Sequence, residues 1–136
     1  MASVLNPYIQ FKDNARAAME FYQSVLGGEL KFSTFGDMGS DGPDADKIMH
    51  STLNSALGFT LMASDTPQGM EHSPGTNVTV SVSGDDADEL RGYWDQLSAD
   101  GTALVPLEKQ AWGDEFGMCV DKFGISWLVN ISQPQA

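Results

Sequence analysis

The order of secondary-structure elements predicted from this sequence occurs twice. Residues 4–11 alternate like a strand, and strands are predicted over residues 29–35, 47–54 and 58–64. Residues 15–26 carry an apolar stripe at helical spacing, which consists of Ala18, Phe21, Tyr22, Val25 and Leu26. The same order, one strand, one helix and three strands, returns between residues 76 and 130. A repeat of this length limits the possible folds, because each copy must bury one sheet face under its own helix.

The end of the second copy is a predicted β-hairpin. From Trp112 to Asn130, two apolar and aromatic runs flank a tight Asp-Lys-Phe-Gly turn, in which Gly124 can adopt a positive φ. Upstream, Asp85 or Asp86 is expected to cap a helix, and residues 103–107 are expected to form a further strand. The apolar face of that helix is predicted to carry Leu90, Tyr93, Trp94 and Leu97. Local similarity supports duplication: Phe21-Tyr22 corresponds to Tyr93-Trp94, and GFTLM at 58–62 corresponds to GISWL at 124–128.

Length and composition predict one α+β domain that spans residues 1–136. The chain has 136 residues, of which 41% are hydrophobic. Within it we expect two tandem βαβββ modules, about 1–65 and 76–132, joined by a linker at about 66–75 that contains two prolines and two glycines. Two curved mixed sheets of this kind are expected to enclose a cleft, and concave sites typically bind small molecules.

Charge and cysteine content exclude several classes of partner. Nineteen acidic residues against seven Lys and Arg give a net charge of -12, which disfavours nucleic acid and anionic membranes. The single cysteine, Cys119, lies in a predicted strand, where we expect a small buried hydrophobe rather than a nucleophile. With no disulfide framework, no basic leader and no apolar run of membrane-spanning length, a cytoplasmic protein is predicted.

Several segments match a known family. They are Asn6-Pro7-Tyr8-Ile9-Gln10-Phe11, Ile48-Met49-His50, Leu61-Met62-Ala63-Ser64-Asp65 and the stretch from Trp112 to Asn130. With them the chain resembles the vicinal oxygen chelate superfamily, which has the glyoxalase and bleomycin-resistance fold, and within it the PhnB-like branch. The resemblance implies a homodimer and a small-molecule ligand. Members of the branch carry the label 3-demethylubiquinone methyltransferase, but no glycine-rich nucleotide-binding turn follows the first strand here.

The resemblance also bears on metal binding. Metalloenzymes of the superfamily take four ligands, typically His and Glu, from the first and last strand of each unit. The corresponding positions here carry no good ligand for a catalytic metal: Asn6, Pro7 or Tyr8 in the first strand, then Met62, Asn77 and Leu128. We therefore predict no metal site and no cofactor, and a divalent metal belongs only to the alternative function.

His50 is the first candidate catalytic residue. Strand alternation places His50 and Thr52 opposite Met49, Ser51 and Leu53. If the latter set meets the helix, His50 points into the cleft, where an imidazole can act as a general base or orient a ligand. The alternative is a histidine that is only hydrogen-bonded within the sheet.

Glu115 is the second candidate catalytic residue. It lies between Asp114 and Phe116 and close to Trp112, and burial beside a second acid would favour a general base that takes a proton next to a carbonyl. The alternative is a solvated acidic turn. Trp112 is either a wall of the pocket or part of a dimer core, and His72 in the linker is expected to be exposed. The residues predicted to line the ligand site are Tyr8, Gln10, Met62, Trp112 and Asn130.

The predicted function is thus a small-molecule-binding protein or enzyme with the ligand in the cleft between modules. One alternative is a divalent-metal-dependent lyase, isomerase or dioxygenase, or a metal-free proton-transfer enzyme that uses His50 or Glu115. Another is a bleomycin-type sequestering protein, whose acidic surface would favour a cationic ligand.

Overall fold

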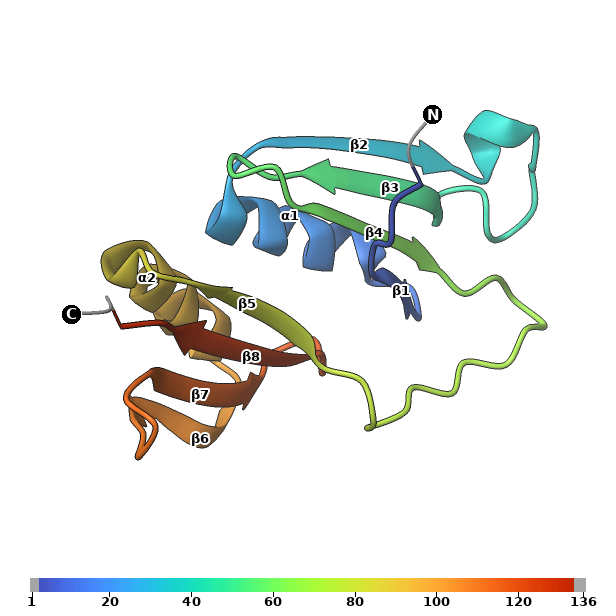
Figure 1. The fold of residues 1–136 in the computed structure, drawn as a ribbon. Coiled ribbons are helices and arrows are strands. Elements are labelled where there is room, and N and C mark those ends of the chain that lie inside the picture. Colours follow the sequence, from blue (N-terminus) through green and yellow to red (C-terminus); the bar gives the residue numbers. More distant parts are fainter. Residues whose placement is uncertain (1–2, 134–136) are drawn as a thin grey trace. The chain divides into compact units, whose positions relative to one another are not determined.

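A computed structural model describes residues 3–133 of the chain. The chain divides into two compact units, Met1–Pro74 and Gly75–Ala136. Each unit contains a strand, a helix and three further strands, in that order, and the helix packs on one face of its own four-stranded sheet (Figure 1). The predicted α+β class and the repeated βαβββ order are confirmed.

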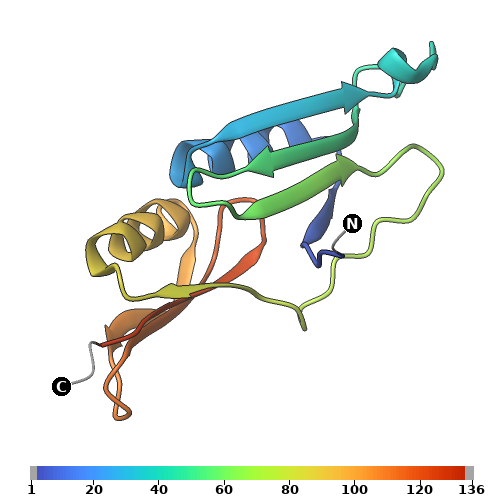
Figure 2. The same cartoon turned by 45° about the horizontal axis from the view of Figure 1, so that its top comes forward.

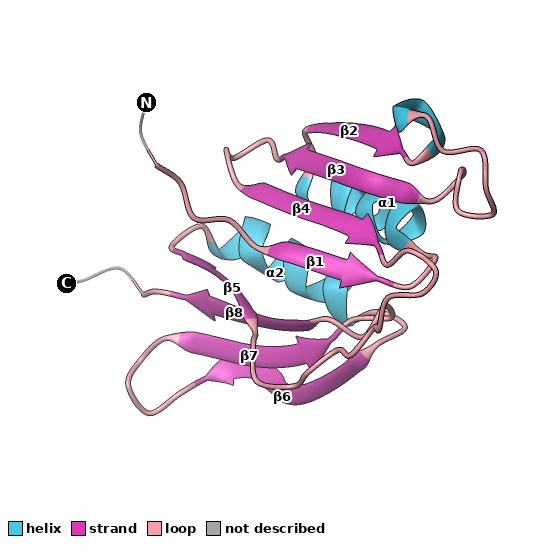
Figure 3. Cartoon of the chain, turned by 90° about the vertical axis from the view of Figure 1, so that its right-hand side faces the viewer, coloured by secondary structure: helices cyan, strands magenta, loops and turns pink. Residues whose placement is uncertain are grey.

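The first unit builds a mixed sheet in the order β1-β4-β3-β2, with β1 parallel to β4 and the other neighbours antiparallel (Figure 3). A short 3₁₀ helix, η1, follows β2 at the end of the sheet (Figure 2). The predicted first strand is shorter than expected and begins at Tyr8. Pro7 has no N–H to donate and contributes only its carbonyl, which accepts from the Met62 N–H of β4 at 3.1 Å. The elements are β1 Tyr8–Phe11, α1 Ala15–Leu26, β2 Glu29–Thr34, η1 Gly36–Met38, β3 Ile48–Asn54 and β4 Thr60–Asp65.

The second unit repeats this topology in the order β5-β8-β7-β6, with β5 parallel to β8. The predicted hairpin is confirmed as β7 and β8, and Gly124 in its turn has a φ of 87°. The first strand of this unit, β5, begins later than predicted. Val78 is 77% exposed, and the pairing with β8 starts at Val80. The elements are β5 Val80–Gly84, α2 Ala87–Ser98, β6 Thr102–Lys109, β7 Glu115–Val120 and β8 Ser126–Ile131.

Both helices bury the apolar stripe that their sequence predicts. On α2 the buried residues are those expected, Leu90, Tyr93, Trp94 and Leu97. On α1 the stripe includes Met19, while Phe21, which was expected in it, is half-buried beside the ring of Tyr22. Residues three and four apart share one helix face, so these stripes fix which side of each helix meets its sheet.

The first turn of α1 is held by a distant carboxylate. Asn14 is the N-cap residue, but its side chain forms no capping hydrogen bond. Instead the Ala15 N–H donates to Asp65 Oδ1 at 2.8 Å, and the Ile48 N–H donates to Asp65 Oδ2 at 2.8 Å. Asp65 is 4% exposed, so this one carboxylate joins the helix start, β3 and the end of β4 in the interior.

Candidate functional site

Strand alternation gives the first sheet two chemically different faces. The face that packs on α1 contains buried Ser51, Leu53, Leu61 and Ala63. Met49 was expected there, but the register shifts next to it: Ser33 pairs with His50 and Thr34 with Ile48, so Ile48 is buried instead. This β-bulge adds one residue to β3 and breaks the simple alternation.

The face opposite α1, which we call the open face of the first sheet, carries a chain of polar side chains. Tyr8 Oη lies 3.1 Å from His50 Nδ1, and His50 Nε2 lies 3.0 Å from Thr52 Oγ1. The Tyr8 and His50 rings are 5.6 Å apart and tilted by 31°. A neutral imidazole has one donor and one acceptor nitrogen, and a hydroxyl can both donate and accept. The three groups can therefore form a chain in which all hydrogen bonds run in the same direction and polarise one another.

The register places further predicted residues around this chain. Met62 pairs with Tyr8 on one side and with Thr52 on the other, while Gln10 pairs with Ser64. Tyr8 is 47% exposed and His50 is half-buried. The structure therefore brings four of the predicted site residues, Tyr8, Gln10, His50 and Met62, onto one face, and their role in binding remains a prediction.

In the second unit the predicted residues separate. Glu115 forms a salt bridge with Arg91 of α2. Asn130 Nδ2 donates to Asp114 Oδ2 at 3.1 Å and pairs across strands with Phe116, which alternates with Glu115. Asn130 and Glu115 thus belong to opposite faces of the second sheet. The carboxylate of Glu115 is held by a cation, and its use as a base remains a prediction.

Trp112 lies just before β7 and is 62% exposed. Its ring meets the ring of Phe116 edge-on, with centroids 5.8 Å apart. An edge-to-face arrangement is a favourable geometry for two aromatic rings, and a role of Trp112 in a ligand site remains a prediction.

The described residues do not form the ligand set of a catalytic metal site. Across residues 3–133, no group of three or more His, Cys, Asp or Glu side chains could hold a metal ion. Two positions implied by the family resemblance, Tyr8 and Met62, are adjacent in the sheet, but a phenol and a thioether are poor ligands for a divalent Lewis acid. We therefore derive no metal-dependent step.

The structure confirms one expectation about single residues and corrects another. Cys119 is 1% exposed, and burial raises the pKa of its thiol to about 11, so it is a poor nucleophile. His72, in contrast, is half-buried rather than exposed. Its Nδ1 lies 3.2 Å from Thr66 Oγ1, because the segment after β4 turns back to bond Phe11 at the end of β1.

The segment that follows β4 lines a surface pocket that we did not predict from the sequence. Its lining comes from the end of β1, the loop before β3 and the segment after β4, and two of its groups are lysines. No motif marks it, since the contributing residues are up to 60 positions apart in the chain; the lining residues are Lys12, Pro43, Asp44, Lys47, Thr66, Pro67, Gln68, Gly69, Met70 and His72.

Comparison with known proteins places the chain in a family. The sequence model of the family described as 3-demethylubiquinone-9 3-methyltransferase matches residues 3–130. The chain belongs to this family, the PhnB-like family. Protein YjdN of Escherichia coli K12 is 27% identical over 96% of this chain and 97% of its own length. The crystal structure of protein PA1353 from Pseudomonas aeruginosa is 33% identical, covers 98% of this chain and 100% of its own, and has a TM-score of 0.88.

More distant structures share the fold of this PhnB-like chain. PhnB protein from Bacillus cereus, titled a putative 3-demethylubiquinone-9 3-methyltransferase, is 22% identical over 96% of this chain and 100% of its own, with a TM-score of 0.77. A glyoxylase/bleomycin resistance protein/dioxygenase domain from Frankia is 13% identical over 98% and 99%, with a TM-score of 0.67. The predicted glyoxalase and bleomycin-resistance fold is confirmed. No helix in the described part of the chain is long and apolar enough to span a bilayer.

Proposed function

We propose that the open face of the first sheet binds a small oxygen-bearing molecule, with Tyr8 and His50 as its polar contacts. The observation that carries the proposal is the hydrogen-bonded chain Tyr8–His50–Thr52, set on the sheet face that α1 does not cover. Hydroxyl and imidazole groups placed this way can both donate to and accept from a ligand oxygen.

The surroundings of the chain favour a molecule with both polar and apolar parts. Met62 lies between Tyr8 and Thr52 in the ladder and offers an adaptable apolar contact. Ser33 and Lys31 flank His50 and Thr52 on β2 and add a hydroxyl and an ammonium. A few polar groups on an apolar base are typical of small-molecule sites.

The same chain supports proton transfer as a second candidate function. The Tyr8 hydroxyl is bonded to a ring nitrogen of His50, whose other nitrogen is bonded to Thr52. Loss of a proton from Tyr8 to a ligand could be compensated through the imidazole, as in general acid–base catalysis. Glu115, in contrast, has its carboxylate paired with Arg91.

Methyl transfer, which the family description names, is not what we propose for this chain. The β1–α1 connection is Lys12-Asp13-Asn14, without a glycine that would let a nucleotide approach the backbone. The Ala15 N–H at the helix start, where a cofactor anion would bind, is already bonded to Asp65.

Ligand binding can be tested by thermal shift and calorimetry with α-keto acids, thiol adducts and cationic antibiotics. We expect at least one class to raise the melting temperature of the wild type, and Tyr8→Phe and His50→Gln each to weaken its binding about tenfold. Tyr93→Phe is the matched control, because it removes a phenolic hydroxyl bonded to Glu89 in the other unit.

The proposal is wrong if Tyr8→Phe, His50→Gln and Tyr93→Phe bind the hit compound equally well. It is also wrong if no compound class shifts the wild type. For proton transfer, the readout is exchange of the α-proton of a bound keto acid with D₂O by NMR, which Tyr8→Phe should slow without an equal loss of affinity.

A further inference from the structure

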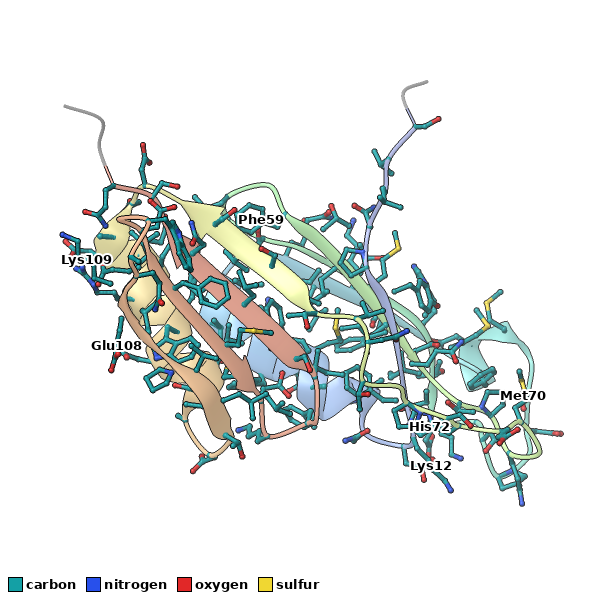
Figure 4. The ribbon with its side chains drawn as sticks, turned by 60° about the horizontal axis from the view of Figure 1, so that its bottom comes forward. Lys12, Phe59, Met70, His72, Glu108 and Lys109 are labelled. Carbon is teal, nitrogen blue, oxygen red and sulfur yellow. The ribbon has the colours of Figure 1, made fainter. Side chains whose placement is uncertain are left out.

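The surface pocket at the end of β1 and β4 is separate from the open face of the first sheet. It has a volume of about 380 Å³ and includes none of Tyr8, His50, Thr52 or Met62. Lys12, His72 and Met70 lie at this end of the first unit (Figure 4). Its polar groups therefore need an explanation of their own.

Lys12 is an unpaired cation in a strongly acidic chain. Nineteen acidic residues face seven Lys and Arg in the sequence, yet Lys12 forms no ion pair with any residue in the described range 3–133. Two nearby acids are instead bonded to Lys47, whose Nζ lies 2.7 Å from Asp13 and 2.9 Å from Asp44. These two contacts raise the pKa of Lys47 above its ordinary range. The charge of Lys12 is thus left for a partner from outside the chain.

Hydrogen bonds fix the orientation of the neighbouring histidine. The Thr66 hydroxyl donates to the Phe11 carbonyl at 3.0 Å, so its single proton is used. His72 Nδ1, 3.2 Å from the same oxygen, must then carry a proton and donate it. In the neutral imidazole this leaves Nε2 as an acceptor, and within residues 3–133 it has no hydrogen-bond partner.

We propose that this pocket binds the oxyanion group of a small molecule, with Lys12 as its counter-charge and His72 Nε2 as a proton-sharing contact. A phosphate monoester suits the pair better than a carboxylate. Its second pKa is about 6, so near neutral pH it is mainly a dianion, but its monoanion is close in free energy and can bind with its hydroxyl donating to Nε2 while its other oxygens accept from Lys12. A carboxylate has no proton to donate, so it needs a protonated His72.

The remaining lining completes the site. Pro43, Pro67 and Met70 supply apolar contacts for the rest of the ligand. The other charged groups that line the pocket, Lys47 and Asp44, are paired with each other, and Asp44 also accepts from the Gln68 N–H at 2.9 Å. This inference does not depend on the function proposed for the open face of the first sheet.

The test uses three probes of similar size: phenyl phosphate, benzoate and benzyl alcohol. Binding is followed by NMR of ¹⁵N-labelled protein and by calorimetry. We expect phenyl phosphate to bind most tightly, benzoate more weakly and benzyl alcohol not at all, with the largest shifts at the Gln68 and Gly69 amides. Equal affinity for the charged and the neutral probes would overturn the proposal.

A pair of lysine variants tests the charge. Lys12→Gln should weaken phenyl phosphate binding about tenfold, the effect expected on loss of a charge-assisted hydrogen bond. Lys109→Gln is the matched control, because it changes the net charge by the same amount. Lys109 lies at the end of β6 in the other unit (Figure 4). His72→Gln should reduce the preference for phenyl phosphate over benzoate. If Lys12→Gln and Lys109→Gln weaken binding equally, the effect is one of overall charge and the pocket is not the site.

Discussion

The two sheets share a topology but differ in the face that their helices leave uncovered. In the first sheet this face carries Tyr8, His50 and Thr52, joined by hydrogen bonds. In the second, the corresponding face combines the apolar side chains of Phe116, Met118 and Leu128 with Ser81 and Asn130, and Ser81 pairs with Leu128 where Tyr8 pairs with Met62. The topology depends on the residues buried under each helix, whereas the alternate residues are free to diverge. Duplication has therefore preserved the fold and confined the hydroxyl–imidazole chemistry to one unit.

The two helices also begin differently. In α2 the Asp86 side chain accepts from the Glu89 N–H at 3.2 Å, a local cap three residues long. In α1 the corresponding acceptor, Asp65, comes from 50 residues downstream and also bonds β3. A local cap stabilises one helix turn, whereas a buried long-range cap couples three elements.

In both units, a glycine after the helix lies close to the backbone of a neighbouring strand. A Cβ on Gly28, at the start of the β2 segment, would lie 2.0 Å from Asn54 O. A Cβ on Gly101, before β6, would lie 2.2 Å from Val120 O. The two sites differ in that Gly28 has a φ of 98°, a region that side chains disfavour.

The largest expected effect is that of Gly28→Ala. A clash with backbone and an unfavourable φ act together, and we expect a loss of about 4 kcal/mol in the free energy of unfolding. Gly101→Ala has the clash alone and should cost about 1 to 2 kcal/mol less. Urea unfolding followed by far-UV circular dichroism measures both, and equal losses would show that the backbone of Gly28 carries no extra strain.

Asp65→Ala should cost about 3 kcal/mol, because it leaves two buried N–H groups, those of Ala15 and Ile48, without an acceptor. All three tryptophans, Trp94, Trp112 and Trp127, lie in the second unit. Tryptophan fluorescence therefore reports on that unit, whereas circular dichroism reports on both. If the units unfold separately, the variant will show an early dichroism transition without a change in fluorescence; if they unfold together, both signals will move.

Asp86→Ala removes only the local cap of α2 and should cost about 1 kcal/mol. Asp86→Ser, which can still accept from the Glu89 N–H, is the control and should restore most of the loss. The comparison of caps fails if Asp86→Ala is as costly as Asp65→Ala in the same urea titration.

Gly92→Ala should have the smallest effect and the opposite sign. Gly92 lies within α2, and a Cβ there would meet no atom within 4 Å; Glu20 occupies the same place along α1. Ala loses less conformational entropy than Gly in a helix, so we expect a gain of about 0.5 to 1 kcal/mol in the free energy of unfolding. A loss of stability would indicate a packing role for this glycine that the structure does not show.

Much of the fold could be predicted from the sequence because it depends on local patterns. Helical spacing identified the buried stripe of α2, and Gly124 marked the turn of the β7–β8 hairpin. The bulge at Met49 could not be predicted, because it arises from the pairing of β3 with β2 and not from the residues of β3 alone. The partial exposure of Phe21 could not be predicted either. A stripe shows which residues are apolar, but not how far the sheet extends beneath them.

The candidate sites divide in the same way. Alternation along β3 was enough to predict that His50 and Thr52 lie on one side of the strand, because side chains of a strand alternate in direction whatever their partners. That Tyr8 and Met62 share this face follows from the register of β1, β4 and β3. Only the tertiary structure showed that Tyr8 reaches His50, that Glu115 is paired with Arg91 and that Asp65 caps α1. These contacts join residues far apart in the chain, and their geometry is set by strand register and by how each helix lies on its sheet.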